Sequence, residues 1–216
     1  MSGHKDWSSL PSPGHVAAGL VFQAAFSAVS GLPPRYAPER ERAVYDDGGG
    51  SSFVLDLGGT VPVLVTRDRD EFDARVSLAE IRAALGPVEL PAPFAGEPDR
   101  YFSGAARWDG ASWTPALGVP GRVAAHVVDD GHLLVEADIA LGEVAEGESD
   151  RDALAALLSA VRAGAWDRET VEAAVRLVPY EGDDALEAEP DPDAALDVLD
   201  RYSAFLGRAI TAGPEH

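Results

Sequence analysis

Residues 52–66 read SFVLDLGGTVPVLVT, a stretch that predicts two antiparallel strands joined by a tight turn. Ser52 to Leu57 and Val61 to Thr66 are rich in the β-branched and aromatic residues that strands favour. Gly58-Gly59 lies between them, and paired glycines are a strong turn signal. Because Val61 to Thr66 is apolar at almost every position, we expect this strand to be well buried.

The sequence on either side extends the predicted sheet. Arg42 to Tyr45 is another strand candidate, and the turn Asp46 to Gly50 follows it. Beyond the pair, Asp68 to Asp70 predicts a turn, and Glu71 to Ser77 alternates apolar and polar residues with period two. This alternation is typical of a half-buried strand.

Ahead of the strands, residues 15–30 predict an apolar helix. The least apolar positions recur every three to four residues and so form one narrow stripe: His15, Gly19, Gln23, Ser27 and Ser30. Such a stripe is typical of a core or dimer-interface helix. It argues against a signal peptide or a membrane span, as does the pairing of Lys5 with Asp6 upstream.

An eight-residue element occurs twice in the chain. Residues 74–81 match residues 137–144 at an offset of 63, with identical or similar residues at most positions. The second copy follows a predicted hairpin, in which Arg122 to Val128 and His132 to Ile139 are strands and Asp129 to Gly131 is the turn. Either the chain contains a duplication, or these are two ordinary hairpins.

Between the copies lies a segment rich in proline and aromatic residues. Ala106 to Trp113 predicts a hairpin with an Asp-Gly turn, which would bring Trp108 and Trp113 together across the strands. The two tryptophans then belong either to a cluster on a sheet face or to the core. We take four aromatic residues as candidates for partner binding: Tyr101, Phe102, Trp108 and Trp113.

Helices are predicted after the second copy. Ser149 and Asp167 are candidate N-caps for two helices, the first of which ends at Gly164. Glu181 to Asp200 carries nine acids and no base, and we expect this run to be a solvated linker that leads into a helix. Asp191-Pro192 suits the start of that C-terminal helix.

These elements define an α+β fold class, with antiparallel sheets and packed helices, and the repeat adds the alternative of two related halves in tandem. The predicted divisions are a flexible tail (1–13), a helix with antiparallel strands (14–90), a Pro/Trp-rich hairpin insert (91–120), a second strand pair with helices (121–180), and an acidic linker with a C-terminal helix (181–216).

Composition narrows the classes of function. The formal net charge is −20, from 37 acidic and 17 basic residues, so nucleic acids and anionic lipid surfaces are repelled. The chain has no cysteine, which excludes disulfides and cysteine-ligated metals. Lys5 is the only lysine, and with abundant Ala, Gly, Asp and Pro this indicates a GC-rich bacterial genome. We expect a cytoplasmic protein.

No sequence motif of known catalytic spacing is present. His126 and His132 flank Asp129 and Asp130 on the predicted second hairpin, where they are either a loose acid–base or metal cluster or ordinary surface residues. Paired acids at turns are explained by the backbone hydrogen bonds that Asp makes there. The glycine runs lack the spacing of phosphate-binding loops. We therefore expect no catalytic residues, no metal and no cofactor.

The order of elements resembles type III secretion chaperones and the related YbjN-type regulators. The resemblance covers residues 15–85, and again 120–178, and rests on an apolar helix followed by these segments: Tyr45 to Gly48, Phe53 to Leu57, Val61 to Val65 and Glu71 to Ile81. It implies a small acidic dimer whose apolar sheet and helix surfaces hold an extended segment of a partner, without catalysis. The aromatic insert, the acidic tail and the second copy depart from that pattern.

We therefore expect a non-catalytic protein-binding module, chaperone-like or regulatory, that acts as a homodimer or as an intrachain pseudo-dimer. One alternative is an immunity or inhibitor protein that masks a basic toxin or nuclease. Another is a small-ligand-binding protein or enzyme that uses the His126/His132 hairpin or a pocket at Trp108 and Trp113.

Overall fold

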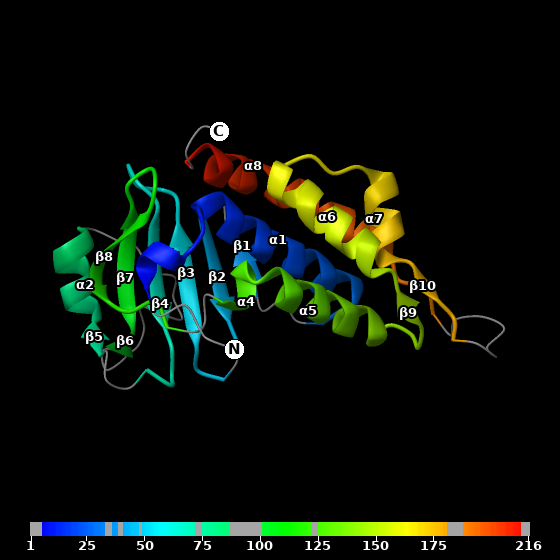
Figure 1. The fold of residues 1–216 in the computed structure, drawn as a ribbon, viewed down its shortest axis with the longest axis horizontal. Coiled ribbons are helices and arrows are strands. Elements are labelled where there is room, and N and C mark those ends of the chain that lie inside the picture. Colours follow the sequence, from blue (N-terminus) through cyan, green and yellow to red (C-terminus); the bar gives the residue numbers. More distant parts are fainter. Residues whose placement is uncertain are drawn as a thin grey trace.

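The protein is described by a computed structural model that covers residues 6–32, 36–38, 41–47, 49–71, 75–86, 101–121, 125–180 and 188–212. It has an α+β architecture in which a sheet lies at one end of an elongated molecule and a layer of helices extends from it (Figure 1). None of the described helices has the length and apolar character needed to cross a membrane.

The main sheet has six strands, and every neighbouring pair is antiparallel. The two strands predicted within residues 52–66 lie near its centre, where Val54 pairs with Val65 and Leu55 with Leu64. In spatial order the strands are β1 (Tyr36–Pro38), β2 (Arg42–Asp46), β3 (Ser52–Asp56), β4 (Val63–Arg67), β7 (Gly104–Trp108) and β8 (Trp113–Gly118).

Both faces of this sheet are buried, which explains the unbroken apolar runs in β3 and β4. Phe53, Leu55 and Leu64 belong to the large core that includes the helices. Val54 and Val65 belong to a smaller core on the opposite face. That second face is covered by helix α2 (Leu78–Leu85) together with β5 (Val76–Ser77) and β6 (Tyr101–Phe102).

Helix α1 (Pro13–Val29) begins beside the sheet and runs through the middle of the helical layer (Figure 1). Ser12 caps it, Pro13 occupies its first turn, and most of its residues are buried, as the narrow polar stripe predicts. A Cβ at Gly19 would lie 2.0 Å from the carbonyl oxygen of Val127, so the backbone of the segment that contains Val127 passes close to the α1 backbone there.

The helices around α1 complete the layer. Short strands β9 (Glu148–Ser149) and β10 (Leu177–Val178) pair at its far end, away from the main sheet (Figure 1). The helices are α4 (Ala125–Val128), α5 (Asp130–Gly142), α6 (Arg151–Ala163), α7 (Arg168–Val175) and α8 (Pro192–Thr211).

The predicted second hairpin is wrong. The described part of residues 122–128 is helix α4, and residues 132–139 lie within helix α5. Asp129 accepts a hydrogen bond from the backbone N–H of His132 at 2.8 Å, so it is a helix N-cap and not a β-turn residue. The buried residues of α5 follow helical spacing: Leu133, Ala137, Ala140 and Leu141.

The two matching octapeptides consequently have different structures. In the first, Ser77 and Glu80 form a capping box that begins helix α2, and the predicted strand 71–77 is reduced in its described part to β5. Residues 72–74 lie outside the described residues. The second octapeptide covers the end of α5. The match therefore does not mark two related halves.

Two of the predicted divisions of the chain, the hairpin insert and the N-terminal tail, also differ from the structure. The hairpin expected within residues 91–120 is β7 and β8, but β7 pairs with β4, so it belongs to the main sheet and is not a separate insert. The expected tail is anchored to the fold by two side chains, because Trp7 and Leu10 are buried and Trp7 Nε1 donates to the Gly118 carbonyl at 3.0 Å.

The predicted helix ends are largely confirmed. Asp167 caps α7, Asp191-Pro192 begins α8, and Gly164 ends α6 in the left-handed conformation with φ of 65°. The N-cap of α6 is Asp150, one residue after the predicted Ser149. Most of the expected acidic linker, residues 181–187, lies outside the described residues.

Candidate functional site

The four aromatic residues predicted to bind a partner do not form a surface. Phe102, Trp108 and Trp113 are buried, and the two tryptophan rings pack edge to face with centroids 5.4 Å apart. Trp113 Nε1 also donates to the Pro11 carbonyl at 2.7 Å. Only Tyr101 is exposed, beneath the guanidinium of Arg75 at 5.3 Å. The tryptophan pair is therefore part of the core that supports α1.

The predicted histidine cluster is not assembled on a hairpin either. His132 lies on α5 and faces Glu136 of the same helix, with Nε2 and Oε1 3.7 Å apart. Asp129 is occupied as the cap of that helix, and the side chain of His126 lies outside the described residues. Within the described chain, no group of three or more potential metal ligands comes together.

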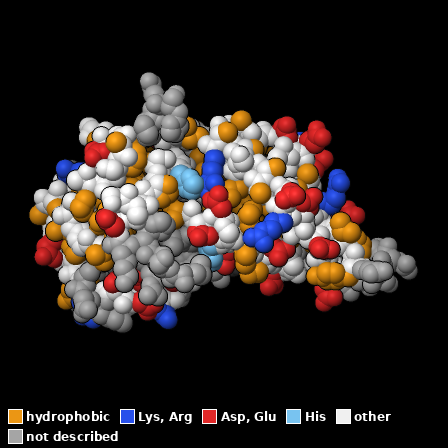
Figure 2. Space-filling view, viewed as in Figure 1, with side chains coloured by type: hydrophobic (Ala, Val, Ile, Leu, Met, Phe, Trp, Pro, Cys, Tyr) orange, Lys and Arg blue, Asp and Glu red, His pale blue; other side chains and the backbone are white. Residues whose placement is uncertain are grey.

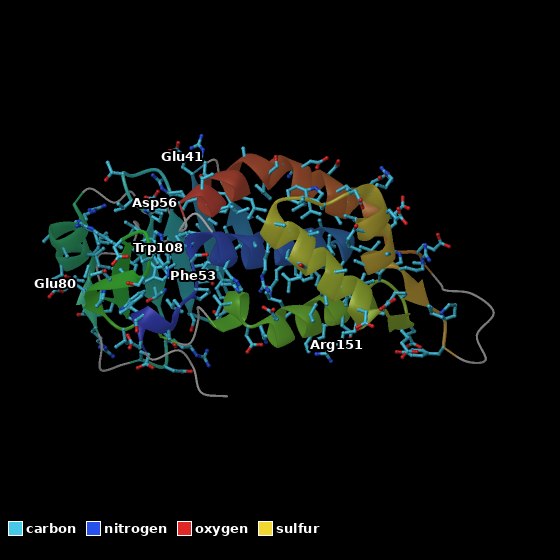
Figure 3. All side chains as sticks on the ribbon, turned by 45° about the horizontal axis from the view of Figure 1, so that its top comes forward. Glu41, Phe53, Asp56, Glu80, Trp108 and Arg151 are labelled. Carbon is cyan, nitrogen blue, oxygen red and sulfur yellow. The ribbon has the colours of Figure 1, made fainter. Side chains whose placement is uncertain are left out.

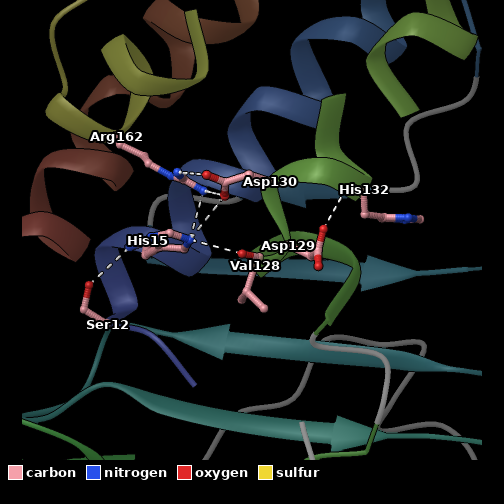
Figure 4. Close-up of polar contacts among 7 residues, drawn as sticks. All are labelled: Ser12, His15, Val128, Asp129, Asp130, His132 and Arg162. Carbon is pink, nitrogen blue, oxygen red and sulfur yellow. Dashed lines mark hydrogen bonds and ion pairs between the residues drawn. The ribbon is translucent and has the colours of Figure 1, made fainter. Parts of the chain in front are cut away.

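The structure instead brings together His15, Asp130 and Arg162, from α1, α5 and α6 (Figure 4). Both terminal nitrogens of Arg162 donate to the Asp130 carboxylate, and the Nη1 to Oδ2 distance is 2.7 Å. His15 Nε2 lies 2.9 Å from Arg162 Nη2 and 3.3 Å from the carbonyl oxygen of Val128. His15 and Arg162 are 147 residues apart in the sequence, so no local pattern could have linked them.

The charges in this cluster offset one another. Burial, and next the positive charge of Arg162, lower the pKa of His15, although the Val128 carbonyl and Asp130 act in the opposite direction. Hydrogen bonds from Arg162 lower the pKa of Asp130. The neutral imidazole can accept from Arg162 as the Nδ1–H tautomer or donate to Val128 as the Nε2–H tautomer. The cluster is thus a three-helix anchor whose polar atoms are directed at each other.

A groove lies away from this cluster, toward the other end of α5 and α6. It is formed by α5, β9, the start of α6 and the residues after β10. Its volume is about 440 Å³, and we call it the α5–β9 groove. The residues that line it are Leu134, Val135, Asp138, Gly147, Glu148, Ser149, Arg151, Leu154 and Tyr180.

Exposed apolar side chains lie on the elements that border this groove, and two of them, Val135 and Tyr180, line it. The described residues include seven exposed large hydrophobic side chains, and four of them lie on α5 or at β10. These four form what we call the α5–β10 patch: Val135 (46% exposed), Ile139 (53%), Val178 (57%) and Tyr180 (52%). Figure 2 shows hydrophobic side chains along α5 and at the end of the molecule that carries β10.

The fold explains why these side chains point outward. Val135 and Ile139 are four residues apart on α5, on the side away from the buried Leu133 and Ala137. In β10, Leu177 faces the core and Val178 faces solvent, because successive side chains of a strand alternate. An apolar surface is therefore fixed by two rigid elements.

Acidic residues border the patch. Between residues 138 and 152 the chain has six acids and one base, Arg151. Ser149 Oγ donates to Asp138 at 2.5 Å, which orients that carboxylate at the groove, and Glu148 is exposed beside it. The groove lining thus combines apolar residues with two acids, Asp138 and Glu148, and one base, Arg151.

A second groove of about 590 Å³ lies beside the main sheet, but its charged groups bind each other. Arg42 pairs with Asp56 at 3.4 Å, Arg208 with Glu41 at 2.5 Å, and Arg107 donates to the Ala84 carbonyl at 3.0 Å. Figure 3 places Glu41 and Asp56 at the sheet and Arg151 at the distant helical end. Because its polar groups are already paired, this groove is the weaker candidate.

The sequence does not reveal the α5–β10 patch, because its pattern at residues 132–139 predicts a strand in place of α5, and the exposure of Val178 depends on its pairing with β9. The signal that could have found it is the pair Val135 and Ile139 outside the helical stripe of α5. Comparison with known proteins adds no relative: no protein-family model, no curated protein and no solved structure matches this chain.

Proposed function

We propose that this protein is a non-catalytic, chaperone-like or regulatory module that holds a segment of a partner protein on the α5–β10 patch. The observation that carries the proposal is the presence of four exposed large apolar side chains on α5 and at β10, of which Val135 and Tyr180 line the α5–β9 groove. Contiguous exposed apolar surface is uncommon on monomeric proteins and often marks a binding surface. Apolar and aromatic residues such as Ile139 and Tyr180 supply the buried centre of such contacts.

The contacts within the His15, Asp130 and Arg162 cluster favour a binding function over a catalytic one. His15, Asp130 and Arg162 bind one another through the terminal nitrogens of Arg162 and link three helices, while Arg162 Nε is buried without a hydrogen-bond partner among the described residues. The resemblance to secretion chaperones agrees with the proposed activity, although the surface proposed here belongs to the helical layer and not to the sheet that carries the resemblance. The buried tryptophan pair is assigned a supporting role within the core.

Site-specific photo-crosslinking tests this proposal. A benzophenone amino acid at Ile139 is expected to crosslink one partner protein in lysate, identified by mass spectrometry. The same probe at Val61 is the matched control, because Val61 is an exposed valine in the turn between β3 and β4, at the second groove. The double variant Val135→Ser/Ile139→Ser should lose capture of that partner, and Val61→Ser should retain it.

Two outcomes would contradict the proposal. One is capture of the partner by the double variant at the wild-type level while circular dichroism shows that the variant is folded. The other is a tightly bound small molecule that copurifies with the protein and is released by the double variant, with no protein crosslinked from Ile139.

A further inference from the structure

We infer that the segment held on the α5–β10 patch is both apolar and basic, a short stretch in which Lys or Arg residues are interspersed with large hydrophobic ones. This inference rests on the proposed function and adds the chemistry of the partner. It follows from the composition of the groove floor, the composition of its rim and the charge of the whole chain.

The floor selects apolar side chains. Leu134, Leu154 and Val135 line the α5–β9 groove, and Tyr180 closes one side of it. Burial of apolar surface favours association, so large apolar side chains of a partner are stabilised when they cover these residues. A purely polar segment would leave this surface in contact with water.

The rim selects positive charge. The carboxylate of Asp138 is held at the groove by Ser149, and Glu148 lies beside it on β9. Arg151, in the first turn of α6, also lines the groove, so the charged residues of its lining are two acids and one base. Lys and Arg side chains can lay their apolar stems on the floor and place the charged end at this rim.

The net charge argues against the other occupants. A second copy of the chain would bring another charge of −20 to an already acidic rim, so self-association through this patch is opposed. Anionic lipid and acidic peptides are repelled for the same reason. A basic and apolar segment is attracted at long range and buried at short range.

Selection from a random peptide library tests the inference. A phage-displayed library of random dodecapeptides is panned on the full-length wild-type chain after depletion on Val135→Ser/Ile139→Ser. The selected peptides are expected to be enriched in Leu, Ile, Val or Phe together with Lys or Arg. Their affinity should fall between about twofold and thirtyfold in Asp138→Asn/Glu148→Gln, as expected from two exposed ion pairs.

The outcomes separate the two proposals. Patch-dependent peptides without basic residues, or peptides whose affinity is unchanged in Asp138→Asn/Glu148→Gln, overturn the inference and leave the proposed function standing. A selection that yields no patch-dependent peptide overturns the proposed function itself. If sedimentation shows a wild-type dimer that Val135→Ser/Ile139→Ser converts to a monomer, the occupant is a second copy and the inference is wrong.

Discussion

His15 links the stability of the helical layer to pH. Its imidazole lies against Arg162 and the Val128 carbonyl, and burial together with Arg162 lowers its pKa. In the unfolded chain the residue titrates near its ordinary pKa of about 6.5. As the pH falls below that value, the unfolded chain takes up a proton before the folded protein does, so folding loses stability until the folded pKa is passed.

We therefore expect the free energy of unfolding to fall between pH 7.5 and pH 5, and part of that fall to disappear in His15→Gln. Urea unfolding followed by circular dichroism at several pH values measures the unfolding free energy of the wild type and of His15→Gln. His132→Gln is the control, because His132 lies on α5 outside the cluster. An unchanged pH profile in His15→Gln would contradict this account.

Arg162 holds the same cluster from α6. In Arg162→Met the Asp130 carboxylate loses its two hydrogen bonds, but its side chain is 55% exposed and regains water. We expect a loss of about 1.5–3 kcal/mol of unfolding free energy, less than for a fully buried ion pair. Arg168→Met is the matched control. The Arg168 guanidinium pairs with Asp193 and Glu172 on the surface. Its removal should lower the unfolding free energy much less than Arg162→Met does. Equal losses in urea titrations would contradict the anchor role.

At the scale of elements, α1 depends on the absence of a side chain at Gly19. A methyl group there would meet the Val127 carbonyl, so Gly19→Ala must separate α1 from α4. We expect destabilisation by about 1–3 kcal/mol or more, as in other overpacked sites. Gly207→Ala in α8 is the control, and we expect it to change stability in the opposite direction, because no heavy atom lies within 4 Å of the added carbon. It should stabilise the protein by about 0.5–1 kcal/mol, measured by thermal and urea unfolding.

The elements that could be predicted are those whose local pattern has one interpretation. Residues 52–66 combine continuous apolar runs with a glycine turn, and they form β3 and β4. Asp129-Asp130-Gly131 is ambiguous, because the same residues suit a β-turn or a helix start, and the tertiary packing of Leu133 and Leu141 on α1 decides for the helix.

The candidate site was harder to predict than the fold, since it depends on which side chains are left uncovered. Val135 and Leu133 are both apolar in the sequence, yet one is exposed and the other is buried. Trp108 and Trp113 belong to the core, the second of the two alternatives, and Trp113 donates to Pro11 just before α1. Only the packing of distant segments distinguishes these cases.

At the scale of the whole molecule, the net charge of −20 acts against compactness. Added salt screens that repulsion, so we expect the melting temperature to rise between 10 mM and 200 mM NaCl. A rise of roughly 2–4 °C corresponds to about 1 kcal/mol for a chain of this size. Scanning calorimetry at constant pH measures it. A melting temperature that falls with salt would show that the attractive ion pairs outweigh the repulsion.

The packing of α1 against α8 also sets the order in which the protein can be completed during synthesis. Gly14 of α1 lies against Ile210 of α8, so the first long helix is covered by the last. A nascent chain leaves the side of α1 that faces α8 uncovered until residues 192–211 have left the ribosome. Contacts of such large sequence separation form late and slowly. The growing chain therefore leaves one side of its most apolar helix exposed until α8 is made, and during this period it is most open to aggregation and to binding by cellular folding factors.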